Sequence, residues 1–419
     1  MRPQKLLSQA ALTTSLVTLL VGAAFAQEIT LQADPEVRIR PLVEKFNAES
    51  PDIKVKLEDI SYQTTVESLP IQLASGQGPD MAVVTDLGGL SKYYLDVGPY
   101  VDKAYFETQF GQSLAWLRGS QGGDAINGVP ITLTVNGAFA NATLFEQAGV
   151  ELPEEGATWE DWAQASKAVA DATGLDFAME IDRSGHRFAS LAISYGAELV
   201  DEQGNPVVDE GLRQAIETFA QWHRDGIMPM DLWGAIGGST HRDNFADFIN
   251  AKVPFYFSGS WKLSPIDKDI GGLFEWRAVA TPCGPSSCTA MPGGNALVGW
   301  KHTRQPEAVA KFLEFAAQEE NLEYYLSTAV YLPTASSLVE KGIDYQGAPA
   351  SVNEAMALFT QQIPKMAPAA HQFQGWAYQR AMMNAMTTRI SQVLNNELDV
   401  DTALKRIKED VELAISAGK

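Results

Sequence analysis

The clearest fold signal comes from residues 53–84, which read IKVKLEDISYQTTVESLPIQLASGQGPDMAVV. Apolar and polar residues alternate over 53–60, which predicts a half-buried strand. Residues 64–74 repeat apolar side chains at helical spacing, so a helix should follow that strand. The run 81–84 is short and wholly apolar, as in a strand buried on both faces of a parallel sheet. The stretch therefore predicts a strand-helix-strand unit.

The alternation of strands and helices continues on both sides of this unit. Upstream, the pattern predicts a strand over 28–33 and a helix over 41–49. Downstream, it predicts strands over 253–260 and 296–300, and the second of these leads into a helix over 306–318. This order is typical of an α/β protein with right-handed crossovers and a parallel sheet.

Residues 129–139 form a different kind of strand. Thr132, Thr134 and Asn136 share one face and apolar residues share the other, which suits a strand bordering a cleft or solvent. A helix should follow over 139–149. From residue 351 onward the pattern is mostly helical, with helices expected over 353–361, 374–395 and 400–415. We interpret four tryptophans as core residues: Trp159, Trp162, Trp222 and Trp300.

The composition is that of a globular protein and excludes some partners. The chain has 419 residues, enough for two or three domains, and 45% of them are hydrophobic. Its 31 Lys and Arg against 52 Asp and Glu give a net charge of −21. Nucleic-acid phosphates and anionic lipids both require clusters of basic residues. We therefore expect neither nucleic acid nor an anionic membrane surface as a partner.

The first 26 residues have the pattern of a secretory signal peptide. Arg2 and Lys5 make a basic start, and no charged residue occurs from 10 to 25. Ala24-Phe25-Ala26 has the small-x-small pattern of a cleavage site, which would leave Gln27 as the mature N-terminus. The apolar run is short for a transmembrane helix, and no Cys follows the cut to carry a lipid. We expect an exported protein without a direct membrane anchor.

The chain has two cysteines, Cys283 and Cys288, in a Gly- and Pro-containing loop. Export places them in an oxidising compartment, and their spacing allows the chain to turn back on itself, so we predict a disulfide. A metal site would need more ligands than two thiols, and the five histidines are scattered. The spacing also differs from a redox CxxC pair. We expect no cofactor.

Nine short motifs occur in an order that resembles a known family. They are 74–81 (ASGQGPDM), 127–130 (NGVP), Asn141 to Gly149, Thr158-Trp159 with Trp162, Asp225-Gly226 with Pro229, Phe248 with 251–253 (AKV), Gly259-Ser260-Trp261, Gly293-Gly294-Asn295, and 307–313 (EAVAKFL). Each motif alone is weak, but together they span about residues 29–414. The chain resembles the extracellular solute-binding proteins of ABC importers, specifically the family 1 carbohydrate binders that include maltose-binding proteins.

The resemblance implies two α/β lobes joined by crossing strands, with a ligand in the cleft between them. One lobe would contain residues 27–134 and 298–334, and the other 135–297 and 335–419. The lobes would close on the ligand by a hinge motion. The resemblance also implies a periplasmic monomer whose partners are a carbohydrate ligand and the permease subunits of an importer.

A sugar site needs a flat aromatic ring beneath the sugar and polar groups around its edge. By position, the resemblance implies a ligand carboxylate at Asp86, stacking rings at Trp261 and Trp376, and backbone approach at Gly294 and Asn295. Arg380 lies four residues after Trp376, on the same face of the expected helix. The structural alternatives are a helix cap for Asp86, core packing for the tryptophans and a surface ion pair for Arg380.

Further candidates come from the crossing strand and from polar loops. Thr134 and Asn136 lie on its polar face, where the family often has an acidic residue that this chain lacks; the alternative is a hydrogen bond within the sheet. The weaker candidates are Tyr62, Gln63, Trp233, His186, Arg187 and Thr240. The loop 182–187 contains two arginines and His186, which could accept an anionic substituent such as a uronate or sulfonate, although a solvated loop is the plainer interpretation.

Other functions stay open at this point. A binder of another polar solute, such as a polyol, an anionic sugar derivative or a polyamine, would have the same fold. A secreted carbohydrate-active enzyme is the other class, because paired carboxylates cannot be recognised from spacing alone. The sequence contains no Gly-x-Ser-x-Gly, His-Glu-x-x-His or phosphate-loop motif. We therefore predict a binding protein and no catalysis.

Overall fold

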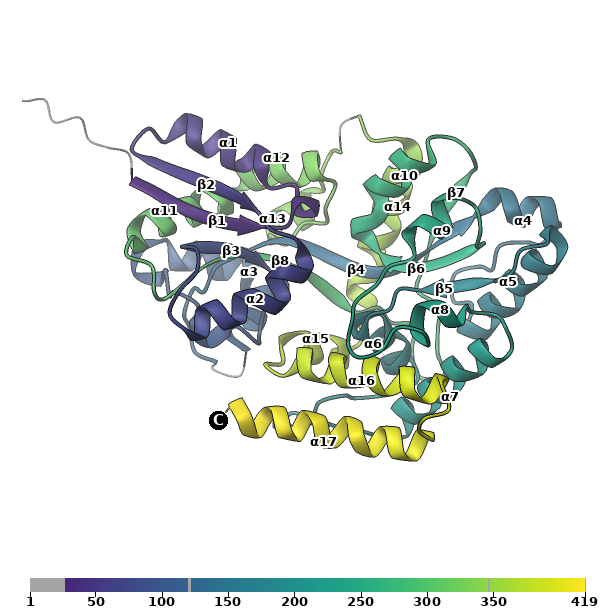
Figure 1. The fold of residues 1–419 in the computed structure, drawn as a ribbon. Helices are drawn as coiled ribbons and strands as arrows, with labels where there is room; N and C mark the ends of the chain where they lie inside the picture. The colour runs from purple at the N-terminus through teal and green to yellow at the C-terminus, as the bar shows by residue number, and fades with distance from the viewer. Residues whose placement is uncertain (1–26, 120–121, 346, 419) are drawn as a thin grey trace, which may run out of the picture.

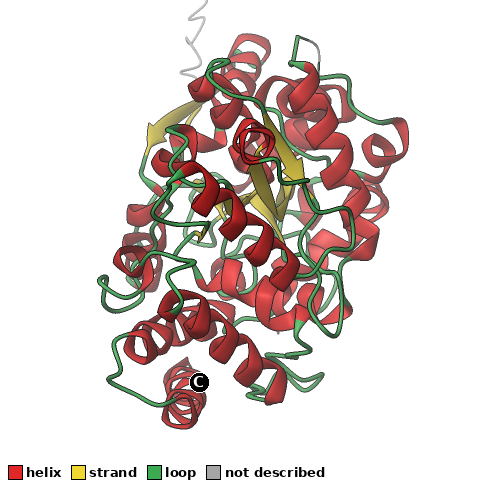
Figure 2. Ribbon diagram, turned by 90° about the vertical axis from the view of Figure 1, so that its right-hand side faces the viewer, coloured by secondary structure: helices red, strands yellow, loops and turns green. Residues whose placement is uncertain are grey.

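The computed structural model of the chain describes residues 27–119, 122–345 and 347–418. The predicted signal peptide, residues 1–26, lies outside the described residues. Among the described residues, no helix has both the length and the apolar character needed to cross a bilayer. Helices surround a central set of strands, and the molecule has two halves that are connected in the middle (Figures 1 and 2).

The described strands form one sheet with the order β2-β1-β3-β8-β4-β6-β5, and β7 pairs with β4. The strands are β1 Gln27–Ala33, β2 Ile53–Asp59, β3 Met81–Val84, β4 Val129–Asn141, β5 Met179–Ile181, β6 Phe255–Gly259, β7 Trp276–Val279 and β8 Pro292–Gly299. The helices are α1 Arg40–Glu49, α2 Tyr62–Ala74, α3 Lys103–Arg118, α4 Ala142–Ala148, α5 Trp159–Thr173, α6 Gly185–Ser194, α7 Glu210–Arg224, α8 Met230–Trp233, α9 Phe245–Ile249, α10 Leu263–Ile270, α11 Pro306–Ala317, α12 Glu319–Ala329, α13 Ser336–Lys341, α14 Ala350–Gln362, α15 Pro368–Gly375, α16 Gln379–Leu394 and α17 Val400–Gly418.

The N-terminal half confirms the predicted strand-helix-strand unit. β1 pairs in parallel with β2 on one side and with β3 on the other, and Leu31 faces Leu57 and Met81 across these pairs. The side chains of Leu31 and Met81 are fully buried, as the apolar patterns predict. β8 then adds antiparallel to β3, so the complete sheet is mixed.

Strand β4 connects the two halves because it changes partners along its length. Its residues up to Val135 pair with β8, and its residues from Asn136 pair with β6 and β7. Figure 1 shows β4 running through the middle of the molecule between the two groups of strands. The exchange between Val135 and Asn136 is one residue away from the lobe boundary expected at 134.

Other predicted lobe boundaries fall inside regions that pack with the N-terminal half. β8 pairs with β3 and the first part of β4 from Pro292 onward, whereas the expected boundary lies at 297. Helix α13 packs against α3 and α12, although it follows the boundary expected at 334. Sequence spacing does not reveal the contacts of β8 with β3 or of α13 with α3, because these segments are far apart in the chain.

Two helices differ from their predicted bounds for local reasons. β4 continues to Asn141 because its last residues pair with β7, so α4 starts three residues later than the pattern suggests, with Asn141 as its cap. The helix expected over 374–395 is broken. α15 ends at Gly375, Trp376 has an extended backbone with φ −73° and ψ 130°, and α16 begins at Gln379.

Two clusters of buried side chains form the core. One surrounds β1 to β3 and continues through Phe359 of α14 to the edge of the second half. The other contains most of the second half, from α5 to α17. The four tryptophans predicted to be in the core, Trp159, Trp162, Trp222 and Trp300, are all buried, which confirms that interpretation.

The disulfide is confirmed. Cys283 and Cys288 are bonded in the loop between β7 and β8, with a Cα–Cα distance of 4.0 Å. The backbone of Cys283 also makes two hydrogen bonds at the start of α5. Its N–H donates to the Ala157 carbonyl, and its carbonyl accepts from the Trp159 N–H. A helix cap is present there too, because Thr158 and Asp161 form a capping box at the start of α5.

Candidate functional site

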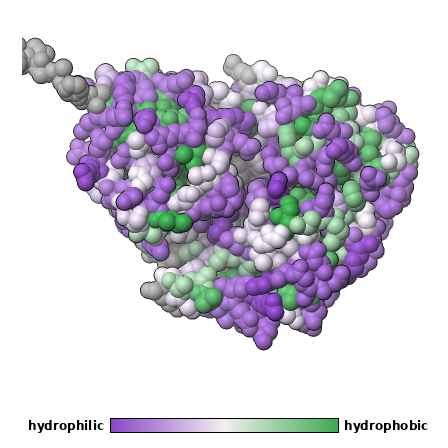
Figure 3. All heavy atoms as spheres, in the orientation of Figure 1, coloured by the Kyte–Doolittle hydropathy of each residue, from purple (hydrophilic) through white to green (hydrophobic). Residues whose placement is uncertain are grey.

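A cavity of about 740 Å³ lies between the two halves of the molecule, lined by residues from both. Figure 3 shows a hollow between the halves on this face, surrounded by mostly hydrophilic side chains. The volume is in the range of small-molecule ligand sites. Nine of the predicted site residues line it: Tyr62, Gln63, Thr134, His186, Arg187, Trp261, Gly294, Asn295 and Arg380.

Trp261 reaches the cavity from a turn directly after β6. A Cβ on Gly259 would lie 2.0 Å from the Trp261 ring, so only glycine allows the indole to lie this close to the strand end. The guanidinium carbon of Arg187 lies 4.2 Å from the centre of the same ring. The predicted stacking ring therefore lines the cavity, but it shares one face with an arginine.

The two adjacent strands β4 and β8 form the floor of the cavity. Gly294 has φ +150°, and a Cβ there would lie 2.1 Å from the Thr132 carbonyl oxygen. Close approach of the strands thus requires glycine at this position. The backbone and side-chain N–H groups of Asn295 both donate to Thr132 Oγ1 at 3.0 Å, which orients the Asn295 side chain at the cavity.

His186 is held against this floor by a network of polar groups. Its Nδ1 lies 3.1 Å from Asn136 Oδ1, and its Nε2 lies 3.1 Å from the Pro292 carbonyl and 3.3 Å from Gln374 Oε1. Burial, followed by the charge of Arg187, lowers the pKa of His186 to about 3, so the ring is neutral near neutral pH. Asn136 is itself fully buried, and its side-chain amide donates to the His186 carbonyl. It therefore has a hydrogen-bonding role behind the cavity, which is closer to the structural alternative than to ligand contact.

Tyr62 and Arg380 meet across the cleft. Tyr62 begins α2 in one half, and its hydroxyl accepts from Arg380 Nη1 of α16 in the other half at 3.4 Å. Its ring also contacts His241 edge to face, with 5.8 Å between ring centres. Burial acts to raise the pKa of Tyr62, but the charge of Arg380 holds it below its usual value.

Asp86 lies behind this pair, outside the cavity lining. Its Oδ1 accepts from the Gly89 N–H at 3.2 Å, in agreement with the alternative of a local backbone cap. Burial raises the pKa of its carboxyl group, and the nearby charge of Arg380 opposes that rise. Asp86 thus influences the site through Arg380.

Three predicted residues lie away from the cavity, and each has a structural reason. Trp376 is in the extended link between α15 and α16, so its ring turns into the core and its Nε1 donates to the Gly204 carbonyl at 3.1 Å. Trp233 is fully buried and donates to the Ile181 carbonyl at 2.7 Å. Thr240 is exposed, and its carbonyl accepts from Arg183. The following residue, His241, lines the cavity instead.

The loop 182–187 is also not the solvated loop that the plainer interpretation expected. Asp182 and Arg183 are fully buried. Arg183 points away from the cleft and donates to the carbonyls of Ile236 and Gly238 at 2.7 Å. Of the two arginines in this loop, only Arg187 lines the cavity.

Several cavity residues are absent from the predicted set, notably Lys262, Gln374 and Gln379. Lys262 is 5% exposed and forms an ion pair with Asp243 at 3.0 Å. Its position directly after Trp261 is the signal that could have identified it. Gln374 and Gln379 flank Trp376, and Gln379 donates to Gln374 at 2.8 Å. This predicted segment therefore lines the cavity through Gln374, Gln379 and the predicted Arg380, but not through Trp376.

No group of three or more His, Cys, Asp or Glu side chains that could hold a metal ion occurs among the described residues.

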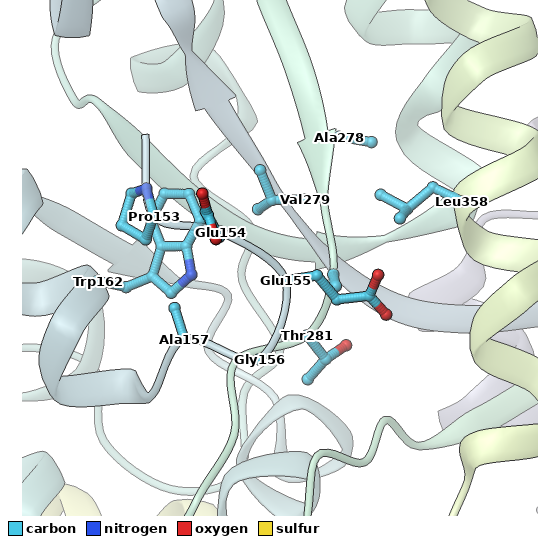
Figure 4. A pocket seen from close by; sticks show the side chains of 11 residues that line it. Pro153, Glu154, Glu155, Gly156, Ala157, Trp162, Ala278, Val279, Thr281 and Leu358 are labelled. Carbon is cyan, nitrogen blue, oxygen red and sulfur yellow. The ribbon is translucent and has the colours of Figure 1, made fainter. Parts of the chain in front are cut away.

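A smaller pocket of about 180 Å³ lies elsewhere, between the 153–157 loop, β7 and Leu358 (Figure 4). It is lined mainly by small and apolar side chains, with Glu154 and Glu155 at its edge.

Comparisons with known proteins agree with this architecture. The family model of bacterial extracellular solute-binding proteins matches residues 32–323. An arabinooligosaccharide-binding protein of Bacillus subtilis (strain 168) is 24% identical over 295 residues, which cover 67% of this chain and 66% of that protein. A maltodextrin-binding protein of the same organism is 23% identical over 328 residues, 74% of this chain and 72% of that protein.

A solved structure has the same fold. An ABC substrate-binding protein from Listeria monocytogenes, in complex with cycloalternan, superposes with a TM-score of 0.78 at 17% identity. The superposition covers 94% of this chain and all of that one, so the two-halved architecture is shared over its full length. Because the family model matches well over half of the residues, the chain belongs to the family of bacterial extracellular solute-binding proteins.

Proposed function

We propose that this protein is the substrate-binding component of an ABC importer and that it binds a carbohydrate in the cavity between its two halves. The observation that carries the proposal is the cavity itself, because it combines aromatic rings with polar groups from both halves. Relatives named for arabinooligosaccharide and maltodextrin binding support a sugar as the ligand.

The lining supplies both kinds of contact that a sugar requires. Trp261 and Tyr62 offer aromatic surface for the apolar C–H face of a sugar ring. Thr134, Asn295 and Gln379 offer groups that donate to or accept from hydroxyls. We propose that these five residues contact the ligand directly.

Binding would be coupled to closure of two lobes, which we propose meet in β4 near the expected boundary at 134, with β8 and α13 in the N-terminal lobe. β4 exchanges partners beside the cavity, so bending there changes the distance between the halves. Arg380 with Tyr62, and Lys262 with Glu36 at 3.8 Å, already connect the two sides. A ligand that contacts both sides favours the closed state by its differential affinity for it.

The remaining expectations complete this proposal. The protein would be exported to the periplasm, act as a monomer and deliver its ligand to permease subunits that recognise the closed form. Its relatives are solute-binding proteins, and we propose that it likewise releases its ligand unchanged.

The test is thermal unfolding of the mature protein with a panel of mono- and oligosaccharides, polyols, amino acids and polyamines. A ligand at 100 times its dissociation constant that binds only the folded state adds about 2.7 kcal/mol of stability. We expect a rise in melting temperature with one class of sugar and recovery of that sugar intact by mass spectrometry. A rise only with a polyol or an amine would exclude the carbohydrate proposal, and a cleaved sugar would exclude a purely binding role.

A further inference from the structure

We propose that the ligand carries an anionic group, bound jointly by Arg187 and Arg380, so that the substrate class is an acidic sugar such as a uronate. The proposal rests on the proposed carbohydrate function and specifies its ligand. It follows from two guanidinium groups that line the cavity and whose terminal N–H groups make no hydrogen bond to a carboxylate of the described residues.

Arg380 is the clearer case. Its one hydrogen bond to a described residue is the long contact from Nη1 to the Tyr62 hydroxyl, at 3.4 Å. Among the described residues, no carboxylate oxygen lies within the 4.0 Å that defines an ion pair with it. Asp86 acts on it only through space. Apart from the contact with Tyr62, the guanidinium N–H groups of Arg380 are therefore open to a ligand in the cavity.

Arg187 is fixed in place but leaves its terminal nitrogens free. Its guanidinium lies over the Trp261 ring at 4.2 Å, and its Nε lies 3.6 Å from Asp182 Oδ2. Asp182 already accepts from Tyr256 at 2.8 Å and Ser258 at 2.6 Å. No described residue accepts a hydrogen bond from the Arg187 Nη1 or Nη2 atoms. Their N–H groups are therefore available to a ligand.

The two arginines act on the same part of the cavity. His186 and His241 each have a pKa lowered to about 3, first by burial and then by Arg187, with Arg380 contributing in the same direction. Both rings are thus neutral near neutral pH, so neither histidine offers a positive charge to an anion. Tyr62 contacts Arg380 and His241, and Arg187 lines the same cavity as these three residues.

The acidic residues of the lining are already engaged with other groups. Lys262 pairs with Asp243 at 3.0 Å and lies 3.8 Å from Glu36. Asp59 pairs with Arg40 at 2.6 Å. Asp34 accepts backbone N–H groups at the starts of two helices.

A carboxylate or a sulfonate on a sugar would satisfy both guanidinium groups. Arginine binds such oxyanions through two parallel N–H···O bonds, and the closed cavity excludes the water that would otherwise screen the charges. The sugar ring would then extend toward Trp261 and Asn295. A neutral sugar would leave the terminal N–H groups of Arg187, and the Arg380 N–H groups that do not contact Tyr62, without an anionic partner on closure.

The experiment compares neutral sugars with their acidic counterparts by isothermal titration calorimetry on the mature protein. The probes are glucose with glucuronate, galactose with galacturonate, and 6-deoxy-6-sulfoglucose to separate a sulfonate from a carboxylate. We expect at least one acidic probe to bind about tenfold or more tightly than its neutral counterpart, with an affinity that falls as salt increases. Arg380→Gln should remove most of this preference, whereas Arg380→Lys should keep part of it.

A matched control separates the local charge from the overall charge. Arg406→Gln removes one positive charge from the exposed face of α17 and should leave the preference unchanged. A neutral sugar that binds as tightly as its acid would overturn the anionic ligand but keep the carbohydrate function. Binding of acidic amino acids alone would keep the anion site and overturn the carbohydrate function. No binding of any acid at about 10 mM would overturn the anion proposal, because two free arginines should give at least millimolar affinity.

Discussion

Two arginines four positions apart have opposite roles in this protein. Arg183 is fully buried and has its guanidinium bonded to backbone carbonyls, while Arg187 presents free N–H groups to the cavity. The difference arises because Arg183 precedes α6, whereas Arg187 lies in its first turn, on the side facing Trp261. At the scale of single residues, the orientation of each side chain decides whether a charge serves stability or binding.

The ring of Trp261 gives a prediction about affinity. We expect Trp261→Ala to weaken binding of the sugar found in the panel by about 1–3 kcal/mol, because the sugar loses a flat surface and Arg187 loses the ring that orients it. Trp261→Phe should retain most of the affinity. Titration calorimetry measures both variants, and an unchanged dissociation constant for the alanine variant would remove this ring from the site.

Glu180 gives a prediction about stability and pH. It lies in β5 with 3% exposure, and burial, reinforced by the charge of Asp247, raises its pKa to about 8 from an ordinary 4.5. The folded protein therefore retains a proton that the unfolded chain releases, so this group lowers stability as pH rises from about 4.5 to about 8. Glu180→Gln should be more stable than wild type by up to about 4 kcal/mol near pH 9 and similar to it near pH 5.

Urea unfolding at the two pH values measures this difference. Glu202→Gln, at an exposed position, is the control and should change stability little at either pH. If Glu180→Gln and wild type lose stability in parallel as pH rises, the carboxyl group is not protonated in the folded state.

At the scale of elements, one loop depends on one buried side chain. The loop 236–243 carries His241 and Asp243 to the cavity, and Arg183 holds it by donating to the carbonyls of Ile236 and Gly238 and to Ser391 Oγ at 2.6 Å. The loop itself is largely exposed, so these bonds replace the packing that it lacks. A loop held in this way keeps its position only while its anchor is intact.

Replacing the anchor should therefore loosen the loop. We expect Arg183→Met to destabilise the protein by about 2–4 kcal/mol, because the carbonyls of Ile236 and Gly238 and the Ser391 hydroxyl lose a charged donor. Amide hydrogen exchange should accelerate over 236–243 and change little in β1 to β3. Arg389→Met, which removes an arginine bonded to Asp410 at the surface side of α16, is the matched control. Unaltered exchange in the loop would show that Arg183 does not anchor it.

At the scale of the whole molecule, buried histidines make the fold sensitive to acid. The pKa values of His186 and His241 are lowered to about 3 and that of His223 to about 4, in each case mainly by burial. The unfolded chain takes up these protons near pH 6.5 and the folded protein does not. These histidines therefore leave the free energy of unfolding unchanged above about pH 6.5 and lower it as pH falls toward 4.

His223 isolates this effect because it lies in the core, away from the cavity. Its Nδ1 lies 2.8 Å from the Phe219 carbonyl, and asparagine can supply a similar donor. Between about pH 7 and pH 4, we expect the wild-type protein to lose more stability than His223→Asn, by up to about 3 kcal/mol. Denaturant unfolding across this range measures how the free energy of unfolding changes with pH. This change does not depend on any destabilisation by the substitution that is the same at every pH. Identical slopes would contradict a neutral His223 in the folded state.

The features that could be predicted from the sequence are those encoded by neighbours in the chain. Alternation and helical spacing predicted β1 to β3 and the helices between them, because each pattern is satisfied by burial of one face. The disulfide followed from a spacing of five residues, and the four core tryptophans from their places in apolar segments. Trp261 was predicted at the cavity from its position in the family resemblance, directly after Gly259-Ser260.

The remaining features depend on contacts between segments that are distant in the chain. Only the tertiary structure shows β4 exchanging partners, Trp376 and Trp233 turned into the core, and Arg187 and Arg380, 193 positions apart, at one cavity. A periodic pattern states which face of an element is buried but not which element buries it. The sequence by itself thus determined the α/β class and the segments of the site. The tertiary structure decided which side chains meet there, because burial and charge pairing depend on partners that local patterns do not specify.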